Sequence, residues 1–303
     1  MSERVSIIVP TLNPGDCLST LCDAIGYQRL KPLEILVVDS SSTDALPVHG
    51  YGEELRVITI DKAAFDHGGT RNLGARQARG EILVFMTQDA TPADDLWLEN
   101  LVAPILSGEA VATFARQLPR EGATPLERFA RHFNYPPTSK IKTIHDVQEM
   151  GFKAFFFSNV CSAVRANGFW EVGGFPQRVV MDEDVLLCAR LMRVGYRVKY
   201  TAEARVFHSH NYTLRQQFKR NFDIGAFVAQ SADLLENAPV GGEGARLVMG
   251  QTRYVIQEGS YLNLFAVFTE AAVKLAGFSL GRKERWLPVG LKRLMSMHSS
   301  FWR

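Results

Sequence analysis

Three consecutive carboxylates, Asp182-Glu183-Asp184, are the strongest chemical signal in this 303-residue chain. Acids in the first turn of a helix stabilise its dipole, and that role accounts for one or two of them. Three acids placed shortly after Gly173-Gly174 exceed what helix capping requires. A carboxylate of such a cluster can take the proton from an attacking hydroxyl group. We therefore interpret one of these three acids as a candidate catalytic residue and expect the others to stabilise the helix start.

Two further acids follow apolar runs that are typical of buried strands. Asp39 comes directly after Ile35–Val38, and Asp89 lies shortly after Ile82–Met86. Ligands of open α/β sheets bind at the carboxyl ends of the strands. Asp39 can accept a hydrogen bond from a pyrimidine imide, and Asp89 can hold Mg²⁺ or Mn²⁺ because hard cations prefer oxygen ligands. The alternatives are a polar turn at Asp39 and a helix cap at Asp89.

The segment His67-Gly68-Gly69 is expected to open a helix that carries Arg71. Glycine allows a ligand to approach the backbone closely, and a helix start favours anions. Arg71 can form charge-assisted hydrogen bonds to a phosphate or a base. The alternative is a glycine-rich turn with a solvated arginine.

Two histidines, His208 and His210, alternate along the chain. We expect them on one face of an extended strand. One of them is a candidate to complete a metal site with Asp89. The alternative is a purely structural pair.

The elements that position these residues alternate between strands and helices, as in a parallel α/β sheet. Strands are expected at 5–9, 34–38, 57–60 and 82–86, and helices at 70–79, 96–106 and 184–194. From Leu214 onward the pattern is helical. We therefore expect a catalytic domain at 1–212 and a C-terminal helical region at 213–303.

The composition is that of a soluble globular protein, with 46% hydrophobic and 22% charged residues. The net charge of +2 gives no indication of nucleic-acid binding. The four cysteines form no C-x-x-C pair, which argues against structural zinc and fits a reducing compartment. Residues 2–4 lead straight into a strand, so no signal peptide is expected. Together these features predict a cytoplasmic protein.

No run reaches the roughly 18 uncharged apolar residues that span a bilayer. The nearest candidate, Tyr261–Phe278, is interrupted by Glu270 and Lys274. Between Arg282 and Arg303, however, six Lys or Arg residues and one acid interleave with apolar side chains. This tail is expected to lie on a membrane surface. The preceding helices are expected to pack on the catalytic domain or to form a homo-oligomer.

Taken in order, motifs between residues 4 and 212 resemble those of the inverting family 2 glycosyltransferases, which have a GT-A fold. The motifs are Ile8-Val9-Pro10-Thr11-Leu12-Asn13, Val38-Asp39 with Ser42-Thr43-Asp44, Arg71-Asn72, Gln88-Asp89, Gly173-Gly174-Phe175 and Glu183-Asp184. Each motif is weak alone, but the ordered set is specific. The stretches 65–72 and 208–212 are most similar to the bacterial rhamnosyltransferase branch, which uses dTDP-L-rhamnose.

The resemblance implies a mixed α/β sheet flanked by helices, with a C-terminal helical extension. It makes Asp184 the base, with Glu183 beside it to orient the acceptor, and places Mg²⁺ or Mn²⁺ on Asp89 and His208. Thr87 stands where the family's metal motif has its first Asp, so Asp89 is the single Asp of that motif in this chain. The nucleotide-sugar pocket would be lined by Pro10, Thr11, Asn13, Asp39, His67, Gly68, Gly69, Arg71, Gln88 and Asp89.

The function implied is inverting transfer of L-rhamnose from dTDP-β-L-rhamnose to a hydroxyl of a saccharide acceptor. The acceptor would be polyprenyl-diphosphate-linked, at the inner face of the cell membrane, during synthesis of a cell-surface polysaccharide. One alternative is a UDP-sugar hexosyl or N-acetylhexosaminyl transferase, because Asp39 suits uracil and thymine equally. A second is a non-catalytic binding protein on a decayed transferase fold. Thr87 favours that second alternative, and the intact acid cluster argues against it.

Overall fold

The computed structural model describes residues 5–44, 46, 54–233, 238 and 242–303, so the predicted lead-in at residues 2–4 lies outside it. The described chain divides into two compact units. The first comprises the residues up to Leu118 together with Tyr135–Gln177 and Glu183–His208. The second comprises Pro119–Asn134, Arg178–Asp182 and Ser209–Arg303.

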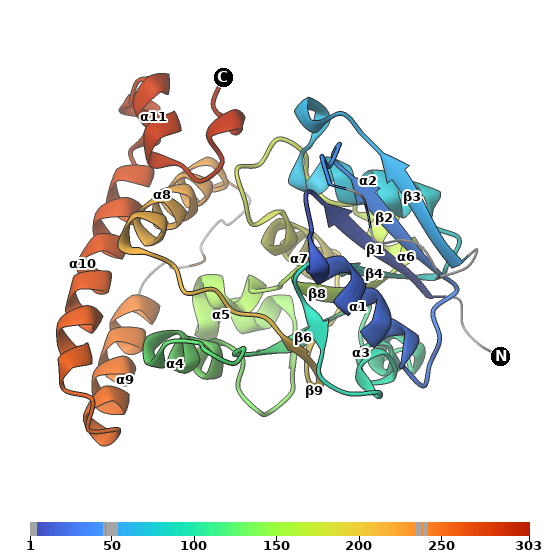
Figure 1. Cartoon of the computed structure of the whole chain (residues 1–303), viewed down its shortest axis with the longest axis horizontal. Coiled ribbons are helices and arrows are strands. Elements are labelled where there is room, and N and C mark those ends of the chain that lie inside the picture. The colour runs from blue at the N-terminus through green and yellow to red at the C-terminus, as the bar shows by residue number, and fades with distance from the viewer. Residues whose placement is uncertain (1–4, 45, 47–53, 234–237, 239–241) are drawn as a thin grey trace. The chain divides into compact units, whose positions relative to one another are not determined.

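A mixed sheet forms the centre of the first unit (Figure 1). Its strands are β1 (Val5–Thr11), β2 (Glu34–Asp39), β3 (Leu55–Thr59), β4 (Ile82–Met86), β5 (Thr91–Pro92), β6 (Ala112–Leu118), β7 (Lys140–Lys142), β8 (Cys161–Arg165) and β9 (Val198–Phe207). Their order is β3-β2-β1-β4-β8-β6-β9-β5, and β7 pairs with β9. The expected strands β1 to β4 run parallel, and β8 is antiparallel to both its neighbours.

Helices cover both faces of this sheet. They are α1 (Asp16–Gly26), α2 (His67–Gln77), α3 (Trp97–Leu106), α6 (Ala166–Glu171) and α7 (Glu183–Arg193), and the short helix α5 (Val147–Met150) belongs to the same unit. Side chains of α1 and α3 share one core with Val5, Ile7 and Val9 of β1. Alternate residues of a strand point to opposite faces, so Ile8 meets α2 instead. There a Cβ on Gly74 would lie 2.5 Å from Ile8 Cγ2, and only glycine lets α2 approach this closely.

The second unit consists of helices: α4 (Pro125–Asn134), α8 (Leu214–Gln230), α9 (Glu243–Gln257), α10 (Leu262–Gly281) and α11 (Val289–Met295). Helices α8 and α10 lie side by side (Figure 1). Their close approach depends on glycines, because a Cβ on Gly277 or Gly281 would lie 2.4 or 2.0 Å from a backbone oxygen of α8. Helix α4 packs on α9, with the rings of Phe129 and Tyr254 5.5 Å apart.

The two units therefore differ from the expected division of the chain into residues 1–212 and 213–303. The first unit ends at His208, close to the expected boundary. The segment Pro119–Asn134, however, groups with the C-terminal helices. The physical reason is apolar packing, because Leu126 of α4 is buried with Val255 and Val267 of α9 and α10. The expected helical C-terminal region thus includes one helix from the middle of the chain.

By length and composition alone, helix α10 could cross a membrane. The mean hydropathy of its most apolar 18-residue window is 1.4, and 17% of that window is buried. Glu270 and Lys274, which we expected to rule out a membrane-spanning segment because they interrupt the apolar run, both lie within α10 and pair with each other across one turn at 3.0 Å. Helices of soluble proteins share this length and composition, so α10 by itself assigns no membrane topology.

Candidate active site

The loops that follow β1 and β2 are tied together by Asn13. Its backbone N–H donates to Ser42 Oγ at 2.8 Å, and its side-chain oxygen accepts from Thr43 N at 2.8 Å. Asp39 is buried and accepts from Ser42 N at 3.1 Å. Because Thr11 pairs with Asp39 in the parallel ladder, both residues lie at the same edge of the sheet. The structure thus brings these predicted pocket residues together.

Gln88 connects the end of β4 to the same edge. Its side-chain oxygen accepts from Leu12 N at 2.9 Å, and its side-chain nitrogen donates to Leu12 O at 3.2 Å. Pro10 pairs with Val38 in the neighbouring parallel strand. Pro10, Asp39 and Gln88 therefore gather where the parallel strands end, which is where α/β sheets bind ligands.

The start of α2 is held by its own cap and by a close backbone contact. Asp66 accepts from Gly69 N at 2.6 Å, so this N–H is already occupied in the structure. A Cβ on Gly68 would lie 2.0 Å from Pro176 O. Glycine is therefore required at position 68 for packing against the segment that precedes the acid cluster. That requirement is independent of any ligand.

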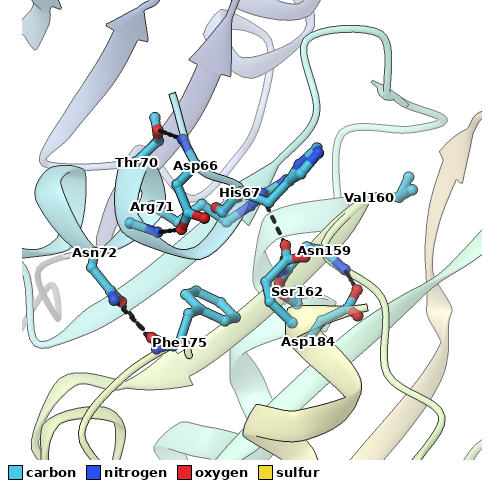
Figure 2. Close-up of polar contacts among 12 residues, drawn as sticks. Asp66, His67, Thr70, Arg71, Asn72, Asn159, Val160, Ser162, Phe175 and Asp184 are labelled. Atoms are coloured by element: carbon cyan, nitrogen blue, oxygen red, sulfur yellow. Dashed lines mark hydrogen bonds and ion pairs between the residues drawn. The ribbon is translucent and has the colours of Figure 1, made fainter. Parts of the chain in front are cut away.

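Arg71 and Asn72 attach α2 to the acid cluster. Arg71 is buried, and its Nη1 donates to Glu183 Oε1 at 3.0 Å and to His67 O at 2.9 Å. Asn72 bonds to both backbone groups of Phe175, at 2.8 and 3.0 Å, and points toward it in Figure 2. The cation that we expected to meet a phosphate thus has a carboxylate partner in the protein itself.

Asn159 contacts both candidate catalytic acids, and Figure 2 shows it beside Asp184. Its side-chain nitrogen donates to Glu183 Oε1 at 3.1 Å, and its backbone N–H donates to Asp184 Oδ2 at 2.8 Å. Glu183 is buried, whereas Asp184 is only partly so. Asn159 was not predicted from the sequence. The available signal was a polar pair, Ser158-Asn159, inside an otherwise apolar run.

Opposing effects set the pKa of Glu183, the buried acid of the cluster. Burial raises the pKa of Glu183, but the positive charge of Arg71, with the hydrogen bond from the Asn159 amide among the other contributions, outweighs it and leaves that pKa below its usual value. Burial lowers the pKa of His67, and the positive charge of Arg71 lowers it further. The negative charges of Glu183 and Asp66 raise this pKa, but they do not outweigh the other two effects. At neutral pH Glu183 is therefore ionised, with its charge balanced by Arg71, and His67 is uncharged. Asp184 is the more accessible of the two acids and the better placed to act as a base.

Asp89 and His208 form the candidate metal site. His208 Nε2 lies 3.5 Å from Asp89 Oδ2. The other ring nitrogen, Nδ1, lies 3.0 Å from Gln117 Oε1. An amide oxygen can only accept, so Nδ1 carries the hydrogen, and in the neutral ring the lone pair of Nε2 is directed toward Asp89. A carboxylate with an imidazole held in this way fits a divalent cation.

The orientation of Gln117 is set in turn by two hydroxyl groups. Its side-chain nitrogen donates to the Tyr135 hydroxyl at 2.6 Å and to Ser158 Oγ at 2.9 Å. None of these supporting residues was predicted, although a glutamine inside the apolar strand β6 was a visible signal.

The hydroxyl of Thr87 is buried without a hydrogen-bond partner in the part of the chain that the structure describes.

The expected extended strand carrying both histidines was wrong. Strand β9 ends at Phe207, before His208, because the ladder with β6 stops there. His210 lies two residues further on, where the chain has entered the second unit. The alternation of side chains along a strand therefore does not describe the positions of the two histidines. His208 lies beside Asp89 as the first residue after the end of β9.

Comparison with known proteins places the chain in a family. Residues 6–173 match the model of glycosyl transferase family 2. The chain is 37% identical to the O-antigen chain rhamnosyltransferase RfbN of Salmonella typhimurium, over 99% of this chain and 96% of that protein. It is 36% identical to the O-antigen chain rhamnosyltransferase WbaN of Salmonella anatum, over 98% and 95% of the two chains.

Two solved structures share the fold. A mannosyltransferase from Pyrobaculum calidifontis, in complex with GDP-Man and Mn²⁺, matches with a TM-score of 0.60 and 19% identity over 100% of this chain and 85% of that one. TarS from S. aureus, in complex with UDP-GlcNAc, matches with a TM-score of 0.57 and 18% identity over 96% and 86%. The chain has the GT-A fold and belongs to glycosyl transferase family 2.

Proposed function

We propose that this protein transfers L-rhamnose from dTDP-β-L-rhamnose to a hydroxyl of a saccharide acceptor, with inversion, during synthesis of a cell-surface polysaccharide. The observation that carries the proposal is 37% identity to an O-antigen chain rhamnosyltransferase over 99% of the chain. The acid cluster and the polar edge of the sheet support it, since they supply a base and a nucleotide pocket.

The donor nucleotide would lie at the carboxyl edge of the parallel strands. Asp39 accepts the imide N–H of thymine, and Pro10, Thr11, Asn13 and Gln88 line the pocket around it. In the structure Asp39 is already oriented by Ser42, so little reorganisation accompanies binding. His67, Gly68 and Gly69 would form the wall at the start of α2. Arg71 would contribute by holding Glu183, its partner in the structure.

The chemical step follows from the different environments of the two acids. Asp184 takes the proton of the acceptor hydroxyl, and the oxygen forms a bond to the anomeric carbon. The bond from that carbon to the diphosphate breaks at the same time, and its electron pair leaves with dTDP. Attack from the face opposite the leaving group converts the β-linked donor into an α-L-rhamnoside. Glu183 stays ionised and orients the acceptor through its neighbours.

Asp89 and His208 would hold Mg²⁺ or Mn²⁺. When bound, such a cation offsets the negative charge of the departing diphosphate. Mn²⁺ is the better match of the two, because it accepts imidazole as well as carboxylate ligands. Gln117 keeps the ring of His208 in the tautomer that a metal requires.

A donor panel tests the proposal. Hydrolysis and transfer would be measured with dTDP-rhamnose, UDP-hexoses and UDP-N-acetylhexosamines, with and without Mn²⁺. Turnover of dTDP-rhamnose alone is the expected result. Turnover of a UDP-sugar instead would favour the alternative donor class, and binding of a donor without any turnover would favour a non-catalytic protein.

Asp184→Asn tests the base. We expect transfer to fall about 10²–10⁴-fold, because proton removal from the acceptor is lost. Donor affinity, measured by calorimetry, should stay unchanged. Asp182→Asn is the matched control, since Asp182 has a φ of 58°, which asparagine tolerates, and has no proposed chemical role. Near-normal turnover by Asp184→Asn would exclude this residue as the base.

We also infer that the protein works at the cytoplasmic face of a membrane, where a polyprenyl-diphosphate-linked acceptor would be found. Leu262, Phe265, Phe268 and Leu275 of α10 are 95, 81, 58 and 66% exposed, which is unusual for large apolar side chains. The tail that follows is basic, which complements anionic lipids. Apolar side chains beside a cluster of cations are typical of an interfacial surface.

Vesicle flotation tests this inference. Phe265→Ser/Phe268→Ser should release the protein from vesicles containing anionic lipid, whereas Tyr27→Ser, at an exposed aromatic residue of the first unit, should not. Equal flotation of both variants would exclude α10 as the lipid-binding face. A dimer that dissociates in the double variant, without vesicle binding by the wild type, would assign the surface to a second copy of the chain.

A further inference from the structure

The second unit contains a cavity of about 250 Å³. Its walls come from α4, α8, α9 and α10 together with the segment from His210 to Thr213. This is smaller than the roughly 300–1,000 Å³ of typical small-molecule sites, which favours a small ligand such as a single sugar ring.

The chemistry of the walls favours a ligand with many hydroxyl groups. The aromatic surface is Tyr212, which stacks with His210 at a centroid distance of 5.2 Å. Hydroxyl, amide and carboxylate groups surround this ring, and such groups both donate to and accept from vicinal hydroxyls. The polar members are Thr124, Glu127, Asn211, Thr213, Gln217, Gln251 and Glu270.

The charges of the cavity argue against a phosphate. Lys274 is the only Lys or Arg among the described lining residues, and it is paired with Glu270 at 3.0 Å. The second carboxylate, Glu127, accepts from Arg131 at 2.7 Å. No lining cation is therefore left to neutralise an anionic ligand, and a neutral sugar fits better.

The charged pair of α10 is otherwise difficult to explain. This helix exposes Leu262 and Phe265 almost fully, yet the side chains of Glu270 and Lys274 are only 20 and 24% exposed. An i,i+4 pair contributes about 0.2–0.5 kcal/mol to a helix, which is too little to account for charges on the inward side. A polar ligand in the cavity gives the pair a role.

The rigidity of the walls points the same way. Gln251 of α9 is 3% exposed, and its side-chain nitrogen donates to Leu126 O of α4 at 3.3 Å. Thr124 N donates to Asn211 Oδ1 at 3.0 Å, which holds the segment from His210 to Thr213 to the start of α4. His210 follows the candidate metal ligand His208 by two residues, so one short segment leads from the metal site to the cavity wall.

We propose that this cavity binds one neutral sugar residue of the saccharide acceptor. The proposal rests on the proposed function, because it assumes that the protein is a transferase with a saccharide acceptor. It assigns to the helical unit the recognition of the acceptor. The donor site remains in the first unit.

The first test fills the cavity. Ala130→Phe adds a ring to a lining position, and Ala245→Phe adds the same ring at an exposed position of α9. The probes are the methyl glycosides of L-rhamnose, D-mannose, D-galactose and D-glucose, and binding is measured by saturation-transfer NMR. We expect at least one glycoside to bind the wild type and Ala245→Phe, and to bind Ala130→Phe at least tenfold more weakly. Equal binding by the two variants, or no binding of any glycoside to the wild type, would overturn the proposal.

A gentler variant covers the case in which Ala130→Phe fails to fold. Glu270→Gln keeps the side-chain volume and removes one carboxylate of the cavity, and Glu258→Gln is its exposed control. We expect the glycoside affinity to fall several-fold in the first variant only. An unchanged affinity in Glu270→Gln would count against the cavity.

Turnover separates the two proposals. If the wild type uses dTDP-rhamnose but the KM for the acceptor is the same in Ala130→Phe and Ala245→Phe, the cavity proposal fails alone. If no nucleotide sugar is used, yet a glycoside binds the wild type and not Ala130→Phe, the proposed function fails and the sugar site stands.

Discussion

Each unit of this protein contains an ion pair of the same length in a different setting. In the first unit Arg71 meets Glu183 at 3.0 Å, with side chains that are 6 and 7% exposed. In the second unit Lys274 meets Glu270, also at 3.0 Å, with side chains that are 24 and 20% exposed. Distance alone would rank the two pairs as equal.

Their surroundings make them different. Glu183 accepts from Asn159 as well as from Arg71, so its charge is balanced in a closed network. Glu270 and Lys274 line an open cavity, where solvent screens their charges. Breaking a buried pair leaves an uncompensated charge, whereas an exposed pair is screened. The first pair therefore holds the two candidate catalytic acids in place, whereas the second contributes little to stability and lines the cavity as a paired, neutral unit.

The largest effect is expected for Arg71→Met. This change leaves Glu183 buried and charged, and we expect a loss of about 3–5 kcal/mol in the free energy of unfolding. Urea denaturation measures it. The double variant Arg71→Met/Glu183→Leu should recover most of the loss, because neither charge remains. A loss below about 1 kcal/mol in the single variant would show that burial does not distinguish the two pairs.

The next effect concerns the candidate metal site of the first unit. Gln117→Leu removes the group that orients His208, and we expect affinity for Mn²⁺ to fall about 10–100-fold. Electron paramagnetic resonance of free Mn²⁺ measures this directly. Gln148→Leu, at an exposed position of α5, should bind Mn²⁺ like the wild type. Equal Mn²⁺ affinity in both variants would remove Gln117 from the site.

A smaller effect is expected from pH. The pKa of His67 is lowered by burial, so the unfolded chain takes up this proton at a higher pH than the folded protein. Stability should therefore be fully present above about pH 6.5, the ordinary value for histidine, and should decline as the pH falls below it. In His67→Asn this decline should be shallower between pH 6.5 and pH 5. Thermal unfolding at several pH values tests it, and parallel curves for the two proteins would contradict it.

The smallest effect is expected for Lys274→Met. Because its pair is partly exposed, we expect the free energy of unfolding to change by less than about 1 kcal/mol. The measurement is the same urea titration used for Arg71→Met. A loss above about 2 kcal/mol would mean that the second pair is as enclosed as the first, and the contrast between the units would disappear.

Much of the first unit could be predicted from the chain. The strands β1 to β4 were visible as apolar runs, and Asp39 and Asp89 were visible as acids at or near strand ends. The partners of those residues were not visible. Arg71 and Glu183 are separated by 112 residues, and no local pattern pairs residues so far apart. Gln117 and Asn159 were missed because single polar residues in apolar runs have many explanations.

The sequence alone determined the element types, the strand-end acids and the order of motifs that marks family 2. These follow from local periodicity and from residue chemistry, which the chain carries at every position. Only the tertiary structure decided that Arg71 neutralises Glu183 and that Gln117 sets the tautomer of His208. It also decided that α4 joins the C-terminal helices around a polar cavity. Those outcomes depend on contacts between distant segments, because burial and close approach arise only when the chain is folded.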